Sequence, residues 1–172
     1  MSDFHDDLLK GNIFKEIVRV LLEKSDYIVI PYGYENPFAN IRKALTHCDS
    51  ETARRIRNSP DLLVYNNEAE DVKLVEVKMS SHAFPQLNRK GQIGTYQKYW
   101  NDAIMVLVLP VDNVFYAQEI ANLGKKEQYD PKTDFRKIQE IFNRIKADDL
   151  ERYKTIARRL IDSMKTDKER IS

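Results

Sequence analysis

The sequence predicts a mixed α/β fold, a small sheet flanked by helices, and three observations indicate it. Apolar residues recur at helical spacing over residues 6–24 and again in two stretches after Gly124. Short β-branched runs stand between polar turns in the middle of the chain. The longest apolar run begins at Ala103 and is typical of a fully buried strand. The predicted order is therefore helix, strand, strand, strand, helix, strand, followed by C-terminal helices.

The individual elements follow from the local pattern. Strands are expected where apolar or β-branched runs lie between turn residues: 27–31, 62–65, 72–79, 103–109 and 114–117, the last as an edge strand. Helices are expected where apolar residues recur every three or four positions: 6–24, 89–101, 135–145 and 150–161. The basic stretch at 40–58 is expected as one or two short helices inserted between the first two strands. We therefore expect a core at 1–124 and a helical appendage of the same domain at 125–172.

Composition excludes several classes of protein. The chain has 28 Lys and Arg against 27 Asp and Glu, so any nucleic-acid binding has to come from local basic clusters. Cys48 is the only cysteine, which excludes an internal disulfide and a cysteine-rich zinc site. The acidic N-terminus has no signal-peptide pattern, and no apolar run is long enough to span a bilayer. We expect a soluble, cytoplasmic protein without a membrane partner.

The candidate catalytic residues are Asp61, Glu76 and Lys78. Side chains alternate across a strand, so Glu76 and Lys78 share one face while Val75 and Val77 face the core. If residue 66 pairs with residue 71, the register continues outward to place Asp61 opposite Glu76, with Cβ atoms about 5 Å apart. Two carboxylates held so close repel each other unless a cation lies between them. Magnesium suits them, because it binds through one or two carboxylates plus waters and phosphate.

This arrangement resembles a known family of nucleases. Pro60-Asp61, fourteen intervening residues and then Glu76-Val77-Lys78 resemble the signature of the PD-(D/E)XK nucleases. The resemblance implies a restriction-endonuclease-like core that hydrolyses DNA with Mg²⁺, or with Mn²⁺ in its place. Asp61 and Glu76 would hold the ion, and Lys78 would orient or help to deprotonate the attacking water. Members of this size generally work as dimers, so the resemblance also implies a homodimer.

Two further motifs extend the resemblance. The family's first helix usually carries a glutamate that reaches the metal, and Glu16 is the matching residue. Gln92 and Tyr96 resemble the Q-x-x-x-Y motif of the RecB-like branch, whose residues reach the site or the nucleic-acid backbone. The simpler alternatives are a surface glutamate at position 16 and a packing role for Tyr96. The resemblance covers residues 11 to about 117.

A basic cluster precedes the signature directly. Arg54, Arg55 and Arg57 end just before Pro60 and are expected to meet phosphates flanking the cut, the alternative being a solvated helix face. We therefore expect a metal-dependent DNA nuclease. The small size is typical of stand-alone endonucleases such as archaeal Holliday-junction resolvases, whereas the Q-x-x-x-Y motif is typical of repair exonuclease domains. An endonuclease is favoured, and the preferred DNA structure stays open.

Two alternatives from other classes remain. The same fold can be kept as a catalytically inactive module that binds nucleic acid or a protein partner, but such modules usually lose an acid or the lysine, and all three are present here. A helical interaction protein with an unrelated α/β core is supported only by the C-terminal helices.

Overall fold

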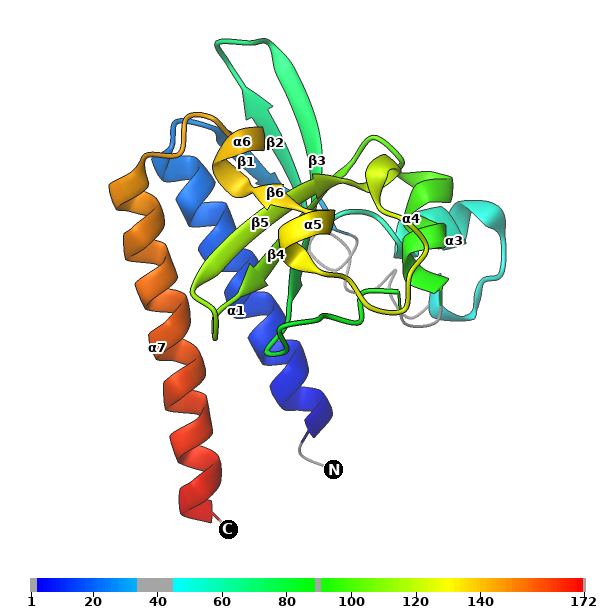
Figure 1. Cartoon of the computed structure of the whole chain (residues 1–172). Helices are drawn as coiled ribbons and strands as arrows, with labels where there is room; N and C mark the ends of the chain where they lie inside the picture. Colours follow the sequence, from blue (N-terminus) through cyan, green and yellow to red (C-terminus); the bar gives the residue numbers. More distant parts are fainter. Residues whose placement is uncertain (1–2, 34–44, 89–90, 172) are drawn as a thin grey trace.

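The strands form one mixed sheet, with helices packed around it (Figure 1). The computed structural model describes residues 3–33, 45–88 and 91–171. Within these residues the sheet has six strands in the order β1-β2-β3-β4-β5-β6, and the pairing is antiparallel except between β3 and β4. Their bounds are β1 Ile28–Pro31, β2 Leu62–Asn66, β3 Asp71–Met79, β4 Ile104–Leu109, β5 Val114–Glu119 and β6 Arg136–Lys137.

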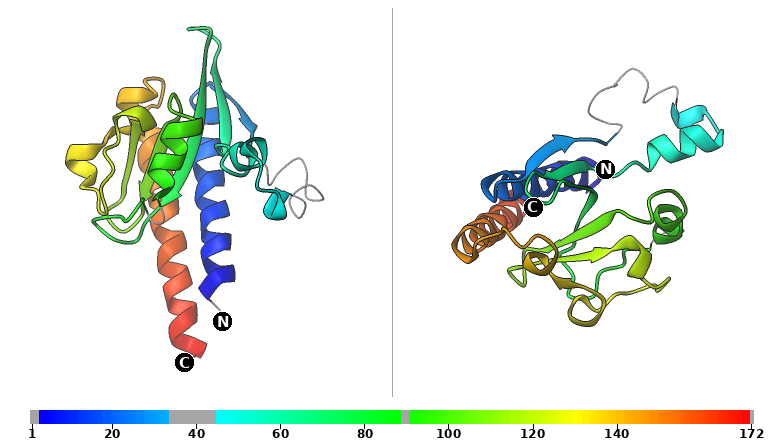
Figure 2. Two further views of the ribbon diagram at one scale, coloured as in Figure 1. Left: turned by 90° about the vertical axis from the view of Figure 1, so that its right-hand side faces the viewer. Right: turned by 90° about the horizontal axis from the view of Figure 1, so that it is seen from above.

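Helices cover both faces of this sheet. Their bounds are α1 Asp3–Lys24, α3 Glu51–Arg57, α4 Gln92–Tyr99, the 3₁₀ turn η2 Ile120–Asn122, α5 Pro131–Asp134, α6 Ile138–Ile141 and α7 Ala147–Ile171. The long helices α1 and α7 lie side by side and run in opposite directions, as Figures 1 and 2 both show. In the part of the chain with described placement, no helix combines the length and apolar character needed to cross a bilayer.

Two apolar cores result, one on each face. Helix α1 contributes Phe14, Ile17, Val18, Leu21 and Leu22, at the i, i+3, i+4, i+7, i+8 spacing that puts one stripe of a helix against a sheet. The same core takes apolar residues from α6 and α7. The second core lies on the other face, under α4, η2 and the segment before β6.

Strand β4 lies between the two cores. Ile104, Val106 and Val108 belong to the α1 side, whereas Met105 and Leu107 belong to the α4 side. Every residue of β4 is consequently buried. This confirms the prediction of a fully buried strand, and it follows because a central strand with both faces covered has no polar side to present.

The predicted order from the first helix to the strand at 104–109 is confirmed, but two predictions beyond it are wrong. Residues 135–145 do not form one helix: Arg136 and Lys137 are strand β6, and α6 ends at Ile141. Strand β5 is therefore not an edge, because Tyr116 and Ala117 pair with β6. The apolar spacing did match a helix, yet backbone pairing with β5 prevails there. Helix α3 lies within the predicted insertion at 40–58, of which residues 40–44 are outside the described residues.

Candidate active site

The hairpin β2–β3 fixes the register that the site depends on. The side chain of Asn66 accepts hydrogen bonds from the backbone N–H groups of Glu68 (3.1 Å) and Ala69 (3.4 Å), and Glu70 takes a left-handed φ of 48°. Asn66 pairs with Asp71, and the ladder runs on to Leu62 opposite Val75. This confirms the predicted register, which places Asp61, one residue further, opposite Glu76.

Glu76 is a buried acid. Its relative exposure is 4%, and it lies on the face of β3 that packs under α4. The Tyr96 hydroxyl donates to Glu76 Oε1 at 2.5 Å, and Lys78 Nζ lies 2.6 Å from the same oxygen. Burial raises the pKa of the Glu76 carboxyl, the positive charge of Lys78 acts in the opposite direction, and the negative charge of Asp61 raises the pKa further. The carboxylate is thus desolvated, next to a cation and another acid.

Asp61 directly precedes β2, which begins at Leu62. Its Oδ2 accepts a hydrogen bond from the backbone N–H of Val77 at 2.9 Å. Val77 lies beyond Val75, the last residue of β3 that pairs with β2. Its backbone N–H therefore has no partner on β2, and the Asp61 side chain accepts its hydrogen bond instead. The other oxygen, Oδ1, forms an ion pair with Lys15 of α1 at 2.6 Å. Asp61 therefore joins the end of the hairpin to the first helix.

The donor set fits a magnesium-like ion. Asp61 and Glu76 supply two carboxylates, and each has an ammonium group, Lys15 or Lys78, close to one of its oxygens. Over the described ranges, no group of three or more His, Cys, Asp or Glu side chains could hold a metal. A zinc site built from three or four side chains does not fit here, whereas Mg²⁺ uses one or two carboxylates and completes its shell with water and phosphate.

The expected glutamate of the first helix does not join this cluster. Glu16 pairs with Arg19, at 2.8 Å to the guanidinium Nε and 2.5 Å to a terminal nitrogen, and its side chain is 57% exposed. The Arg19 hydrogen bond lowers the pKa of the Glu16 carboxyl. The residue that α1 does bring to the site is Lys15, which the sequence reasoning missed. Adjacent helical residues point in different directions, so Lys15 reaches Asp61 whereas Glu16 pairs with Arg19.

The two residues of the Q-x-x-x-Y motif, Gln92 and Tyr96, have different surroundings. Tyr96 is buried and contacts both Glu76 and Lys78, whose Nζ lies 3.5 Å from the tyrosine oxygen. Burial and the neighbouring Glu76 charge raise the pKa of Tyr96, so it stays a hydrogen-bond donor at neutral pH. Gln92 is exposed in the first turn of α4, one turn before Tyr96. The structure thus brings together Asp61, Glu76, Lys78 and Tyr96.

The three arginines of α3 have different surroundings. Arg54 is exposed and pairs with Asp49 at 3.1 Å. The exposed guanidinium of Arg55 lies 4.9 Å from the centre of the Trp100 ring, directly after α4. Arg57 is half-buried and donates to the carbonyl of Cys48 at 2.5 Å and to that of Leu45. Arg57 therefore holds the preceding loop, whereas Arg54 and Arg55 are open to solvent.

Comparison with solved structures shows a distant structural likeness. No protein-family model matches the chain, and no curated protein sequence matches it. Among solved structures, the chain is similar to Hjc, a Holliday junction resolvase from the hyperthermophilic archaeon Archaeoglobus fulgidus. The sequence identity is 18%, the match covers 78% of this chain and 96% of that chain, and the TM-score is 0.48. So distant a match assigns no activity, which has to be inferred from this chain's own side chains.

Replacing Tyr96 tests the surroundings of Glu76. Tyr96→Phe keeps the buried ring but removes the hydroxyl whose hydrogen bond lowers the pKa of the Glu76 carboxyl. That pKa then rises further, so any activity that needs the Glu76 carboxylate is expected to fall by about 10-fold, with the acid limb of its pH profile moved to higher pH. The pH profile of this activity is measured beside Tyr99→Phe, the matched change on the same helix. An acid limb in the same place in both variants contradicts the role given to Tyr96.

Proposed function

We propose that this protein is a divalent-metal-dependent nuclease of the PD-(D/E)XK kind, acting on DNA through Asp61, Glu76 and Lys78. The observation that carries the proposal is a buried carboxylate, Glu76, that faces the charge of Asp61 and lies 2.6 Å from Lys78. Burying an acid destabilises a folded chain unless the charge is compensated. Perturbed acids beside a lysine are typical of catalytic sites.

Each side chain has a role that its contacts support. Asp61 and Glu76 would hold the ion, the backbone N–H of Val77 keeping the Asp61 carboxylate in position. A bound Mg²⁺ or Mn²⁺ supplies the charge that acidifies a water and stabilises the developing phosphorane. Lys78, with a side chain 28% exposed, extends from the buried acid toward solvent and would orient the attacking water or donate to the phosphate. Tyr96 would hold Glu76 in place.

Retention of the fold as an inactive binding module is the second candidate. It would need neither Glu76 nor Asp61 in these positions, and an apolar residue at position 76 would stabilise such a module. The intact acid–acid–lysine set therefore favours the enzyme.

The DNA would extend from the site over α3. Arg54 and Arg55 are exposed, Arg55 lies over the ring of Trp100 directly after α4, and Lys98 of α4 pairs with Glu51 of α3 at 2.6 Å. In our proposal these two arginines and Gln92 contact phosphates flanking the cut. We favour endonucleolytic action in the cytoplasm, as expected from the sequence.

A homodimer is part of the proposal, because one hydrolytic site cuts one strand. Ile28 and Ile30 on edge strand β1 are 53% and 51% exposed, and they supply an apolar surface on the sheet face that also carries Glu76. We expect sedimentation velocity to give twice the chain mass of 20.2 kDa, and Ile30→Lys to return it to that mass. A wild-type protein that sediments as one chain at micromolar concentration contradicts the dimer.

The function is tested by cleavage of defined DNAs. Supercoiled plasmid and linear, single-stranded and branched DNAs are incubated with Mg²⁺, Mn²⁺ or EDTA. We expect cleavage with either metal, none with EDTA, and a loss of about 10³-fold or more in Asp61→Asn. Asp71→Asn is the matched control, because Asp71 lies on the same hairpin and pairs with Lys73. Cleavage that persists in EDTA, or in Asp61→Asn, rejects the proposed mechanism.

A further inference from the structure

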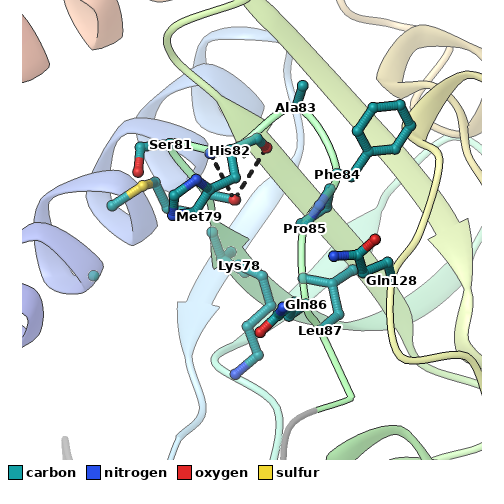
Figure 3. Close-up of a pocket in the computed structure, with 13 residues that line it drawn as sticks. Lys78, Met79, Ser81, His82, Ala83, Phe84, Pro85, Gln86, Leu87 and Gln128 are labelled. Atoms are coloured by element: carbon teal, nitrogen blue, oxygen red, sulfur yellow. Dashed lines mark hydrogen bonds between the residues drawn. The ribbon is translucent and has the colours of Figure 1, made fainter.

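Lys78, the proposed catalytic lysine, lines a cavity of about 860 Å³. Residues 80–87, which follow β3, form most of its wall, and residues 77–79 of β3, Gly11 of α1 and Gln128 complete it (Figure 3). The cavity therefore lies at the carboxyl end of β3, next to the parallel strand β4. The carboxyl ends of parallel strands are where open α/β sheets place their ligands.

Hydrogen bonds give the wall a definite shape. Ser80 Oγ accepts from the N–H of His82 at 3.1 Å and donates to the carbonyl of His82 at 3.2 Å, the two contacts dashed in Figure 3. The backbone N–H of Tyr129 donates to the carbonyl of Pro85 at 3.1 Å, which ties the loop to the segment that carries Gln128. The loop at residues 80–87 and the segment that carries Gln128 are thus held together by a backbone hydrogen bond.

The lining suits a flat, neutral, partly polar molecule. Among the described residues no carboxylate lines the cavity, and the cation Lys78 lines it together with the imidazole of His82. Met79, Pro85 and Leu87 supply apolar surface, and the amides of Gln86 and Gln128 supply donors and acceptors. A phosphate would need several cations or N–H groups and would leave most of this volume empty. A nucleobase has apolar faces and a polar edge, and the cavity lies within the range of about 300–1,000 Å³ typical of ligand pockets.

Phe84 adds an aromatic surface at the cavity. Its relative exposure is 57%, whereas Phe14, Phe115, Phe135 and Phe142 are at most 5% exposed. Phe84 and Gln128 both line the cavity, as Figure 3 shows. An exposed aromatic ring beside amides is the surface on which unpaired bases stack, since every base offers a π-face.

We propose that this cavity binds an unpaired nucleobase of the DNA, next to the phosphodiester that Lys78 faces. The inference rests on the proposed nuclease function, and it names the substrate class: DNA that has unpaired nucleotides at the cut, as in an overhang, a flap or a branch. A base stacked within a closed duplex cannot enter the cavity without first being extruded.

The test measures binding without cleavage. Fluorescence anisotropy in EDTA compares a labelled duplex that has a short unpaired thymidine overhang with the blunt duplex of the same sequence. We expect wild type to bind the overhang DNA at least about 5-fold more tightly, and Phe84→Ala to lose that preference while binding the blunt duplex unchanged. Val72→Ala is the matched control, because Val72 is equally exposed at 55% and lies on β3 outside the cavity.

A second variant narrows the cavity instead of removing its aromatic ring. A Cβ built at Gly11 meets nothing within 4 Å, so Gly11→Leu should be accommodated and should favour helix α1. We expect an unchanged or raised melting temperature together with the same loss of overhang preference.

The outcomes separate this inference from the proposed function. Metal-dependent cleavage with unaltered overhang binding in both variants overturns the pocket and leaves the nuclease standing. Phe84-dependent overhang binding without any cleavage overturns the nuclease and supports the pocket. Equal affinity of the wild type for both DNAs overturns the pocket directly.

Discussion

Lys78→Ala is expected to lower the rate of DNA cleavage by about 10²- to 10⁴-fold and to leave divalent-metal binding intact. Lys78 is placed to act on the water or the phosphate, and the two acids are placed to hold the ion. Removing the ammonium 2.6 Å from Glu76 takes a competing positive charge away from the carboxylate. The loss of Lys78 also raises the pKa of the Glu76 carboxyl, so metal affinity should stay the same or increase only at a pH where that carboxyl is ionised.

Two measurements separate these roles. Single-turnover cleavage gives the rate of the chemical step, and calorimetric titration with Mn²⁺ gives the affinity for the ion. Lys73→Ala is the matched control, because Lys73 lies on the same strand and pairs with Asp71, away from the site. Joint loss of cleavage and Mn²⁺ binding in Lys78→Ala would show that the lysine organises the site and does not act in the chemical step.

The hairpin could be predicted because its geometry is local. Alternation along a strand puts Glu76 and Lys78 on one face whatever surrounds them. The turn is equally local, since the side chain of Asn66 bonds to the backbone two and three residues later and so fixes which residues pair. From these two facts Asp61 follows by counting, and the structure has the same register.

The part of the site that lies on α1 depends on a packing detail that no pattern contains. Apolar spacing correctly predicted the buried stripe of the helix. Which polar neighbour of that stripe reaches Asp61 depends on how the helix is rotated over the hairpin, and adjacent residues differ by about 100°. Lys15 and Glu16 both flank the stripe, and the structure brings Lys15 to Asp61.

Nonlocal pairing explains the other differences. The 135–145 segment has helical spacing, but Arg136 and Lys137 pair with β5, a contact that a periodicity argument cannot see. The cavity beside Lys78 could not be predicted from the sequence for the same reason. Its wall is an irregular loop closed by Gln128, some forty residues further along the chain.

Glu76→Gln is expected to abolish metal binding and to lower cleavage by about 10³-fold or more, and yet to stabilise the metal-free protein at neutral pH. Burial holds the pKa of the Glu76 carboxyl above its ordinary value of 4.5. The folded state therefore binds this proton more tightly than the unfolded state does. The contribution of this proton to the stability of the fold is complete below the pKa that the Glu76 carboxyl has in the unfolded chain. It is lost as the pH rises through the higher pKa that this carboxyl has in the folded protein. An amide at this position has no such proton to lose.

Thermal unfolding in EDTA across the pH range checks this prediction. We expect the melting temperatures of wild type and Glu76→Gln to approach each other at low pH and to separate as the pH rises. The separation should be about 2–4 °C for each kcal/mol of difference in the free energy of unfolding. Glu119→Gln, an exposed acid of β5 paired with Arg136, should show no such divergence. Added Mg²⁺ should raise the melting temperature of wild type alone, because it binds only an intact pair of acids. A wild-type chain as stable as Glu76→Gln at every pH, and indifferent to Mg²⁺, would mean that Lys78 and Tyr96 already compensate the buried charge, which would favour a structural role for the cluster.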